Sequence, residues 1–269
     1  MTDAPAVLLT GASRGIGAAA AIEFARRGYD LAIVATDAEA LRKVAQQIEQ
    51  LGRSAIVLPG DLADLNYVAT LVPKTIERFG RIDVLVNNAA WRETVTMRKI
   101  SLESWERTLR ICLTTPALLA RDAAVHMEPR GRGVIINVSS IMSQHATGTA
   151  PAYVAAKGGM DALSYELAAL YGASGVRVLA FNPGAIDTEM SANYSAGDDD
   201  VNARLRQCTE DMIPLRRWGT SEEIARTLAW LASDDATYIT GTTIVADGGW
   251  SHQLHPYSLK ARMHPGQFR

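Results

Sequence analysis

The fold of this chain is decided by the stretch AVLLTGASRGIG, residues 6–17. Its first part, Ala6–Thr10, is an apolar run typical of a buried strand, and an alanine-rich run up to Arg27 predicts a helix. A glycine turn between a strand and a helix is where a dinucleotide pyrophosphate binds, because the helix N-terminus attracts anions. The spacing G-x-x-x-G-x-G departs from the general fingerprint, so a turn without a ligand and an S-adenosylmethionine-binding sheet stay open at this point.

Strand-like and helix-like runs alternate along the rest of the chain. Further strands are predicted at Leu31–Ala35, Ser54–Leu58, Val84–Val86, Val134–Val138, Val176–Phe181 and Thr243–Ala246. Further helices are predicted at Ala38–Leu51 and around 65–79, 102–128, 150–171 and 221–232. The alternation predicts an α/β fold in which right-handed crossovers build one doubly wound, mostly parallel sheet with helices on both faces. We expect a single domain at 1–251 and a tail at 252–269.

The composition excludes several classes of function. The chain has 269 residues and a net charge of −2, which argues against a broad nucleic-acid or membrane-binding surface. It has no apolar run near the ~18 residues of a membrane span, and its N-terminus lacks the features of a signal peptide. Cys112 and Cys208 do not make a disulfide framework. No metal site is expected, since His252 and His255 lack local partners and Asp198-Asp-Asp200 is typical of a solvated loop. The default expectation is a soluble, reduced, cytoplasmic protein.

A second motif, Tyr153-Val-Ala-Ala-Lys157, lies in the helix predicted around 150–171. Residues four apart share a helix face, so a phenol and an ammonium would meet there. Free tyrosine has a pKa of about 10, and a nearby cation favours the phenolate, which makes the pair an acid/base catalyst for near-neutral pH. Ser140 ends a strand-like run and could donate its hydroxyl to a carbonyl oxygen. An ordinary buried helix whose tyrosine and lysine reach water is the alternative.

Together these motifs resemble those of the short-chain dehydrogenase/reductase family over nearly the full chain. The resemblance is carried by TGASRGIG at 10–17, NNAA at 87–90, Ser140, Tyr153-x-x-x-Lys157, Asn182-Pro-Gly184 and Asp247-Gly-Gly249. It implies a seven-stranded Rossmann-type sheet and an NAD(P)-linked hydride transfer at a carbonyl or secondary-alcohol carbon. Tyr153 would exchange the proton, Lys157 would hold the nicotinamide ribose and make Tyr153 more acidic, and Ser140 would orient the substrate oxygen.

The resemblance also implies a cofactor site at the carboxyl ends of the strands, where open sheets bind ligands. Asp61 would hydrogen-bond the adenine, Asn88 would lie along the ribose, and Ile186 and Thr188 would clamp the carboxamide. The cofactor-binding residues expected in this way are Gly11, Ser13, Arg14, Gly15, Ile16, Gly17, Thr36, Asp61, Leu62, Asn88, Tyr153, Lys157, Pro183, Ile186 and Thr188.

The end of the second strand bears on the choice between NAD and NADP. A carboxylate there selects NAD through the ribose 2′-hydroxyl, whereas an arginine accommodates the 2′-phosphate of NADP. By the family's spacing the acidic position falls at Ala35, which leaves Arg14 and Thr36 to receive the phosphate. Asp37 would oppose this if it turned inward. We therefore expect NADP as the cofactor, with NAD as the alternative.

The chain departs from the family's pattern at Ala90, where glycine is usual, and at Cys112. The family usually has asparagine where Cys112 falls, and that asparagine helps to hold a water in the proton path behind Lys157. Because a thiol is a weak donor and acceptor, a catalytically impaired dinucleotide-binding sensor or scaffold is the alternative function. The intact Ser140, Tyr153 and Lys157 favour an enzyme, and the glycine spacing disfavours a nucleotide-sugar epimerase.

Two segments are expected to border the substrate. Residues 189–217 are long and polar and are placed to act as a lid over the nicotinamide. The basic tail after Trp250 is either a disordered terminus or, as we expect, a segment that packs across a neighbouring subunit of a homotetramer or homodimer. The loop residues that could border the pocket are Trp91, Arg92, Gln144, His145 and Tyr194. They favour a polar small-molecule carbonyl or alcohol, such as a sugar, polyol, keto acid or 3-oxoacyl thioester, over a sterol.

Overall fold

Seven parallel strands form the sheet in the computed structural model, which describes residues 4–192 and 199–268. The strand order is β3-β2-β1-β4-β5-β6-β7, which confirms the doubly wound topology. The strands are β1 (Ala6–Thr10), β2 (Asp30–Ala35), β3 (Ala55–Pro59), β4 (Val84–Asn87), β5 (Gly133–Val138), β6 (Val176–Pro183) and β7 (Thr243–Ala246). They differ from the predicted strands by at most two residues at either end.

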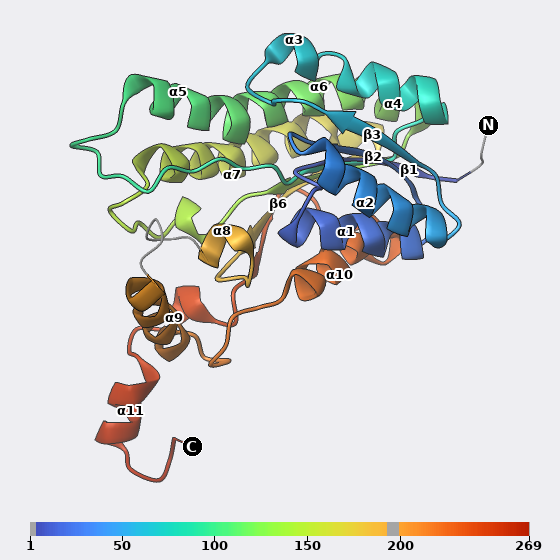
Figure 1. The fold of residues 1–269 in the computed structure, drawn as a ribbon. Helices are drawn as coiled ribbons and strands as arrows, with labels where there is room; N and C mark the ends of the chain where they lie inside the picture. The colour runs from blue at the N-terminus through green and yellow to red at the C-terminus, as the bar shows by residue number, and fades with distance from the viewer. Residues whose placement is uncertain (1–3, 193–198, 269) are drawn as a thin grey trace.

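Helices cover both faces of this sheet (Figure 1). One face carries α1 (Gly15–Arg26), α2 (Ala38–Gln50) and α10 (Ser221–Ala232). The other carries α4 (Leu71–Phe79), α6 (Thr115–Met127) and α7 (Pro151–Tyr171), with α5 (Leu102–Leu109) packed on α7. In β1, Val7 and Leu9 join the core on the first face, and Ala6 and Leu8 join the core on the second. The central strands are mostly apolar, as expected where helices cover both faces of a sheet.

Two of the predicted helices are interrupted. The segment around 65–79 divides into α3 (Leu65–Val68), which Asp64 caps by accepting from two backbone N–H groups, and α4. The segment around 102–128 passes from α5 through a π turn at Arg110–Thr114 into α6. Pro116 explains that turn, because a proline ring clashes with the carbonyl four residues earlier, which here is that of Cys112. Short 3₁₀ turns lie at Glu128–Arg130, Ile141–Ser143, Gly172–Ser174, Asp234–Ala236 and Trp250–His252.

The strand order reverses between β1 and β4, and this creates a crevice at their carboxyl ends. The end of β1 is joined to the segment after β4 by one hydroxyl. Thr10 Oγ1 accepts from the backbone N–H groups of Asn88 and Ala89, each at 3.0 Å. The two halves of the sheet therefore meet in a fixed geometry at the place where the sequence predicts the cofactor.

The predicted lid contains α8 (Glu189–Ala192) and α9 (Asp199–Met212), and the tail contains α11 (Tyr257–Met263). Figure 1 shows α9 and α11 beside each other at the edge of the molecule, away from the sheet. Tyr194 and Asp198 lie outside the described residues. Within the described part of the chain, every helix is too short or too polar to cross a bilayer.

Candidate active site

Helix α7 presents the predicted Tyr153 and Lys157 on one face at the edge of the crevice. Both side chains are buried, with 8% and 1% of their surface exposed. Lys157 Nζ lies 5.5 Å from the centroid of the Tyr153 ring and donates to Val138 O, at the end of β5, at 2.6 Å. The four-residue spacing thus brings the ammonium next to the phenol, as the sequence indicates, and the sheet holds it there.

Ser140 follows β5 and lies across the same site. Its Oγ accepts from Met142 N at 3.1 Å, so it caps the short 3₁₀ turn and its own proton can be donated to another group. The preceding residue, Ser139, donates to Lys157 O at 3.0 Å and so ties the end of β5 to α7. Ser140 and Tyr153 line one cavity of about 700 Å³. The two residues predicted to meet the substrate oxygen therefore belong to the same cavity.

The glycine loop borders a second cavity of about 330 Å³, which shares Tyr153 with the first. A Cβ on Gly17 would lie 2.0 Å from Gly11 O, and Gly11 has a φ of +68°, so these positions require glycine. Arg14 precedes α1 without a side-chain capping bond, which leaves the first N–H groups of that helix to a ligand. Uncapped amides, a glycine loop and this cavity fit the pyrophosphate of a dinucleotide.

All the predicted cofactor residues line this second cavity except Ile186, which lines the first. Two of them also brace its walls. Asn88 Nδ2 donates to Thr10 O at 2.9 Å and to Gly11 O at 3.1 Å, so it supports the glycine loop. Asp61 accepts from Ala63 N and from Arg107, both at 2.9 Å. Burial opposes ionisation of Asp61, but these hydrogen bonds outweigh it and lower the pKa of the carboxyl below its usual value.

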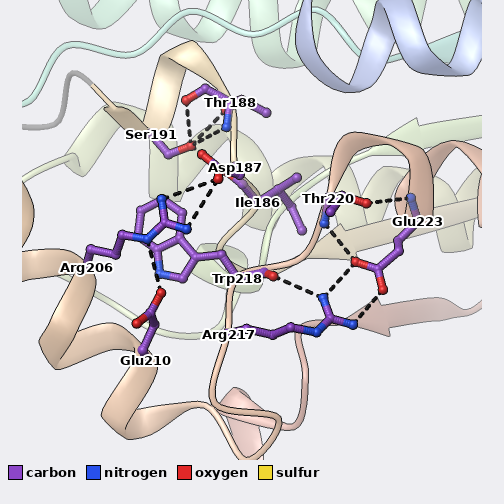
Figure 2. A network of polar contacts seen from close by, with 10 residues as sticks. All are labelled: Ile186, Asp187, Thr188, Ser191, Arg206, Glu210, Arg217, Trp218, Thr220 and Glu223. Atoms are coloured by element: carbon purple, nitrogen blue, oxygen red, sulfur yellow. Dashed lines mark hydrogen bonds and ion pairs between the residues drawn. The ribbon is translucent and has the colours of Figure 1, made fainter.

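The segment predicted to clamp the carboxamide is fixed by a polar network (Figure 2). The Ser191 hydroxyl lies 2.5 Å from Ile186 O and 3.2 Å from Thr188 N. Arg206 of α9 donates to Asp187 at 3.3 Å and to Glu210 at 3.0 Å (Figure 2). The Arg206 guanidinium also lies 5.0 Å from the centroid of the Trp218 ring. The lid helix is therefore anchored to the clamp segment.

Comparison with known proteins agrees with this geometry. The model of the family described as enoyl-(acyl carrier protein) reductase matches residues 11–251. The chain is 38% identical to cis-4-hydroxycyclohexanecarboxylate dehydrogenase of Sinomonas cyclohexanicum, over 91% of this chain and 95% of that protein. It is 32% identical to glucose 1-dehydrogenase 2 of Bacillus subtilis, over 94% and 96% of the two chains. L-sorbose reductase of Gluconobacter frateurii, solved with NADPH and L-sorbose, aligns with a TM-score of 0.87 and 28% identity, over 93% and 98% of the chains.

The chain belongs to the short-chain dehydrogenase/reductase family. As a member of that family it is an NAD(P)-dependent oxidoreductase, and its relatives are named dehydrogenases and reductases. Its fold is the family's fold, so the resemblance drawn from the motifs is confirmed.

This short-chain dehydrogenase/reductase carries Cys112 in the π turn before α6, and the thiol is fully buried. Cys112 Sγ lies 3.4 Å from Trp91 N and 3.5 Å from Trp91 O, so a single thiol contacts both polar groups of that residue's backbone. Its role is to hold the loop after β4 against the helix, with weak hydrogen bonds. Ala90 has no positive φ, since Arg216 is the only described non-glycine residue that has one. The backbone at position 90 therefore does not require glycine.

Two charged residues near the end of β2, Asp37 and Arg14, both have partners within the protein. Asp37 caps α2 by accepting from Glu39 N and Ala40 N, each at 3.0 Å, so its carboxylate faces a helix N-terminus. Arg14 pairs with Glu189 of α8 at 2.7 Å, and both side chains are largely exposed. This pair joins the glycine loop to the lid.

The residues predicted to border the substrate are divided between the two cavities. Arg92 and His145 line the larger cavity, and Trp91 lines the smaller one. Gln144 is in neither lining, and Tyr194 lies outside the described residues. In the described part of the chain, no group of three or more His, Cys, Asp or Glu side chains is suited to hold a metal ion.

Sequence reasoning did not find three residues of this site, namely Arg107, Ser191 and Arg206. Arg107 contacts Asp61 across 46 positions of sequence, and Arg206 contacts Asp187 across 19, so local spacing carries no signal for either. Ser191 follows Thr188 by three positions, which is a common distance for a local hydroxyl bond. That spacing could have identified it.

Proposed function

We propose that this enzyme transfers hydride between the nicotinamide of NADP and a carbonyl or secondary-alcohol carbon of a small polar substrate. The observation that carries the proposal is the buried Lys157 ammonium beside the phenol of Tyr153, which lines one cavity together with Ser140. A phenol next to a fixed cation is suited to exchange a proton at the substrate oxygen.

In the proposed reaction each side chain has one task. Tyr153 gives its proton to the oxygen of a ketone during reduction and takes it back during oxidation. Ser140 donates a hydrogen bond to that oxygen, and Lys157 stabilises the phenolate and holds the nicotinamide ribose. The bound nicotinamide supplies or accepts the hydride. The amides at the start of α1, with Ser13 and Ile16 of the loop, would bind the pyrophosphate.

The preference for NADP over NAD is supported by the charges near the second strand. Asp37 accepts from N–H groups at the start of α2 and is not in the lining of the smaller cavity, which supports a site open to a 2′-phosphate. Arg14 and Thr36 line the cavity beside the uncharged Ala35 and could receive that phosphate. NAD remains the alternative cofactor. Cytoplasmic location, and a homotetramer or homodimer in which the tail reaches a neighbour, likewise remain predictions.

The catalytically impaired sensor or scaffold is the second candidate function, and Cys112 is the observation that favours it. Its thiol contacts the backbone of Trp91, and it is a weaker donor and acceptor than the asparagine amide usual in the family. Relatives named for sugars and for a cyclic hydroxy acid suggest which compounds to test first.

The test is Tyr153→Phe, which removes one hydroxyl and keeps the ring beside Lys157. We expect turnover of carbonyl and alcohol substrates to fall by about 10²–10⁴-fold, as for loss of a general acid/base. Nicotinamide fluorescence should show unchanged NADPH binding. A variant that retains most of the wild-type kcat would be incompatible with the role proposed for Tyr153.

A further inference from the structure

The described lining of the larger cavity carries a positive charge and no negative one. Of the described residues that line it, Arg92 is the only one with a permanent charge, and none is an aspartate or glutamate. His145 is the only other basic residue in that lining. A cavity wall of this kind favours an anion over a neutral or cationic ligand, because a charge inside a protein is screened less than in water.

Arg92 lies close to the reacting position. Its Cζ is 5.7 Å from the centroid of the Tyr153 ring, and Lys157 Nζ is 5.5 Å from the same centroid. Its Nη1 lies 3.9 Å from the Met142 sulfur, and Met142 also lines the cavity. A group bound by this guanidinium would therefore lie within a few bonds of the carbon whose oxygen meets Tyr153.

We propose that Arg92 binds a carboxylate of the substrate, and that the substrate is a secondary alcohol or ketone bearing that carboxylate near the reacting carbon. This inference rests on the proposed function and specifies its substrate class. Guanidinium is the group that best matches a carboxylate, because its fork donates two parallel hydrogen bonds. Those bonds offset the cost of removing the carboxylate from water.

The other residues that line the cavity indicate what kind of carbon skeleton the acid has. Leu205, Met212, Trp218 and Trp250 contribute large apolar surfaces to the cavity. Hydroxyl and amide side chains also line the cavity, among them Thr147, Ser251 and Gln253, and they could pair with the reacting oxygen or with one further polar group of the substrate. A hydroxy acid or oxo acid with a hydrocarbon body matches both the apolar walls and the single guanidinium.

Binding of an unreactive pair of compounds tests the carboxylate directly. Cyclohexanecarboxylate and cyclohexanecarboxamide have the same shape and differ in charge, and neither has a reacting oxygen on its ring. We expect the NADPH-loaded enzyme to bind the carboxylate about tenfold or more tightly than the amide, measured by calorimetry. In Arg92→Gln the preference should disappear, whereas Arg98→Gln removes a charge from an exposed position of the same loop and should keep it.

Turnover provides the second arm, with 3-oxocyclohexanecarboxylate and its methyl ester as substrates. The wild-type enzyme should have the higher kcat/KM for the acid, and Arg92→Gln should lose about tenfold or more on the acid and little on the ester. Equal binding of the first pair, or no binding of either, overturns the proposal. So does an equal loss on acid and ester with a displaced pH profile, which would make Arg92 a positioning residue for Tyr153.

The two arms distinguish failure of this inference from failure of the proposed function. If the ester or other neutral ketones are reduced and the acid is not, the oxidoreductase function stands and the carboxylate assignment falls. If the acid binds through Arg92 and no ketone or alcohol changes the nicotinamide absorbance, the assignment of the charge stands and the proposed reaction falls.

Discussion

At the scale of single residues, Arg14 has two possible partners, a cofactor phosphate and Glu189. Both partners of its ion pair with Glu189 line the smaller cavity, and both side chains are more than 60% exposed, so the pair is weak. A bound 2′-phosphate offers the guanidinium a doubly charged partner instead. If Arg14 binds the 2′-phosphate as proposed, cofactor choice and the position of α8 are linked through this one side chain.

Replacing Arg14 by Gln should raise the KM for NADPH by roughly tenfold or more and change the KM for NADH little, because only NADPH loses a charged hydrogen bond. Glu189→Gln should lower the KM for NADPH, because it releases Arg14 from its ion pair. Steady-state kinetics with both cofactors checks each variant. Equal changes for NADPH and NADH would contradict a contact with the 2′-phosphate.

Cys112 is predicted to stabilise the loop that carries Trp91 and Arg92. Cys112→Ala removes the two thiol contacts and should lower the free energy of unfolding by about 1–2 kcal/mol. It should also raise the KM for substrate, because the loop borders both cavities. Cys208→Ala is the matched control, since that cysteine is exposed. One thiol should react with a thiol reagent in the folded protein, and two should react in the unfolded protein. Rapid reaction of both thiols in the folded protein would contradict the burial of Cys112.

The residues that could be predicted from the sequence are those whose chemistry depends on local spacing. Tyr153 and Lys157 lie four apart on a helix, and Gly11 and Gly17 lie in one turn, so their relation follows from local backbone geometry. The roles expected of these residues came from the resemblance of their motifs to those of the family. Arg107 was missed because its partner comes from another part of the chain, and only the fold brings the two side chains together.

At the scale of elements, the tail helix α11 packs against the lid helix α9 of its own chain. Asp211, near the end of α9, accepts from Ser258 N at 3.0 Å and Ser258 Oγ at 2.6 Å, and also from Arg216 at 2.6 Å. The Ser258 hydroxyl and Arg216 lower the pKa of Asp211, so the carboxylate stays charged at neutral pH. Arg216 also lies 4.4 Å from the centroid of the Tyr257 ring. These contacts give the tail a place in the monomer that the sequence pattern did not predict.

Deleting residues 254–269 should raise the KM for substrate several-fold and leave NADPH affinity nearly unchanged, because α9 lines the larger cavity and not the smaller one. Ser258→Ala should act in the same direction to a smaller extent. Arg262→Gln, at an exposed position of α11, serves as the control. Light scattering on the deletion variant tests the neighbouring-subunit contact, and an unchanged KM together with an unchanged size would dismiss both roles of the tail.

Helix boundaries were the least predictable part of the fold. The run 102–128 has a continuous apolar periodicity, and nothing in that pattern marks the π turn at Arg110–Thr114. Pro116 is the only local signal, and a proline near the start of a helix is ordinary in most contexts. The clash of Pro116 with the carbonyl of Cys112 explains the turn in the folded chain, but the apolar pattern does not show that the helix continues on both sides of it.

At the scale of the whole molecule, carboxylates paired with arginines link stability to pH. Glu223 completes the capping box of α10 with Thr220, and Arg217 donates to it at 2.6 Å (Figure 2). The Arg217 hydrogen bond and the Thr220 amide lower the pKa of Glu223 from 4.5 to about 2. Burial opposes the ionisation of Asp83, but hydrogen bonds from Arg81 and from Ala6 N outweigh it. The pKa of Asp83 is therefore lowered as well.

Because the folded state lowers the pKa of Glu223, its stabilising contribution is present above pH 4.5 and is lost as the pH falls toward 2. Glu223→Gln keeps an oxygen for the Thr220 amide and removes the charge. At pH 7 it should cost about 1 kcal/mol or less, since the pair is partly exposed. The difference from wild type should narrow between pH 5 and pH 3 in thermal unfolding. It should narrow less for Thr220→Ala, because the Thr220 hydroxyl makes only a minor contribution to the lowered pKa of Glu223.

The position of β1 between β2 and β4 has a consequence for how the protein is made. The first strand of the sheet along the chain lies in the interior of the sheet, so its second edge stays unpaired until Val84–Asn87 has left the ribosome. Parallel pairing across such a distance is slow and leaves intermediates with open edges. The nucleotide crevice comes into existence only when that edge is closed. Recovery of nicotinamide fluorescence during refolding should therefore mark the docking of the two halves, and not the earlier gain of helix.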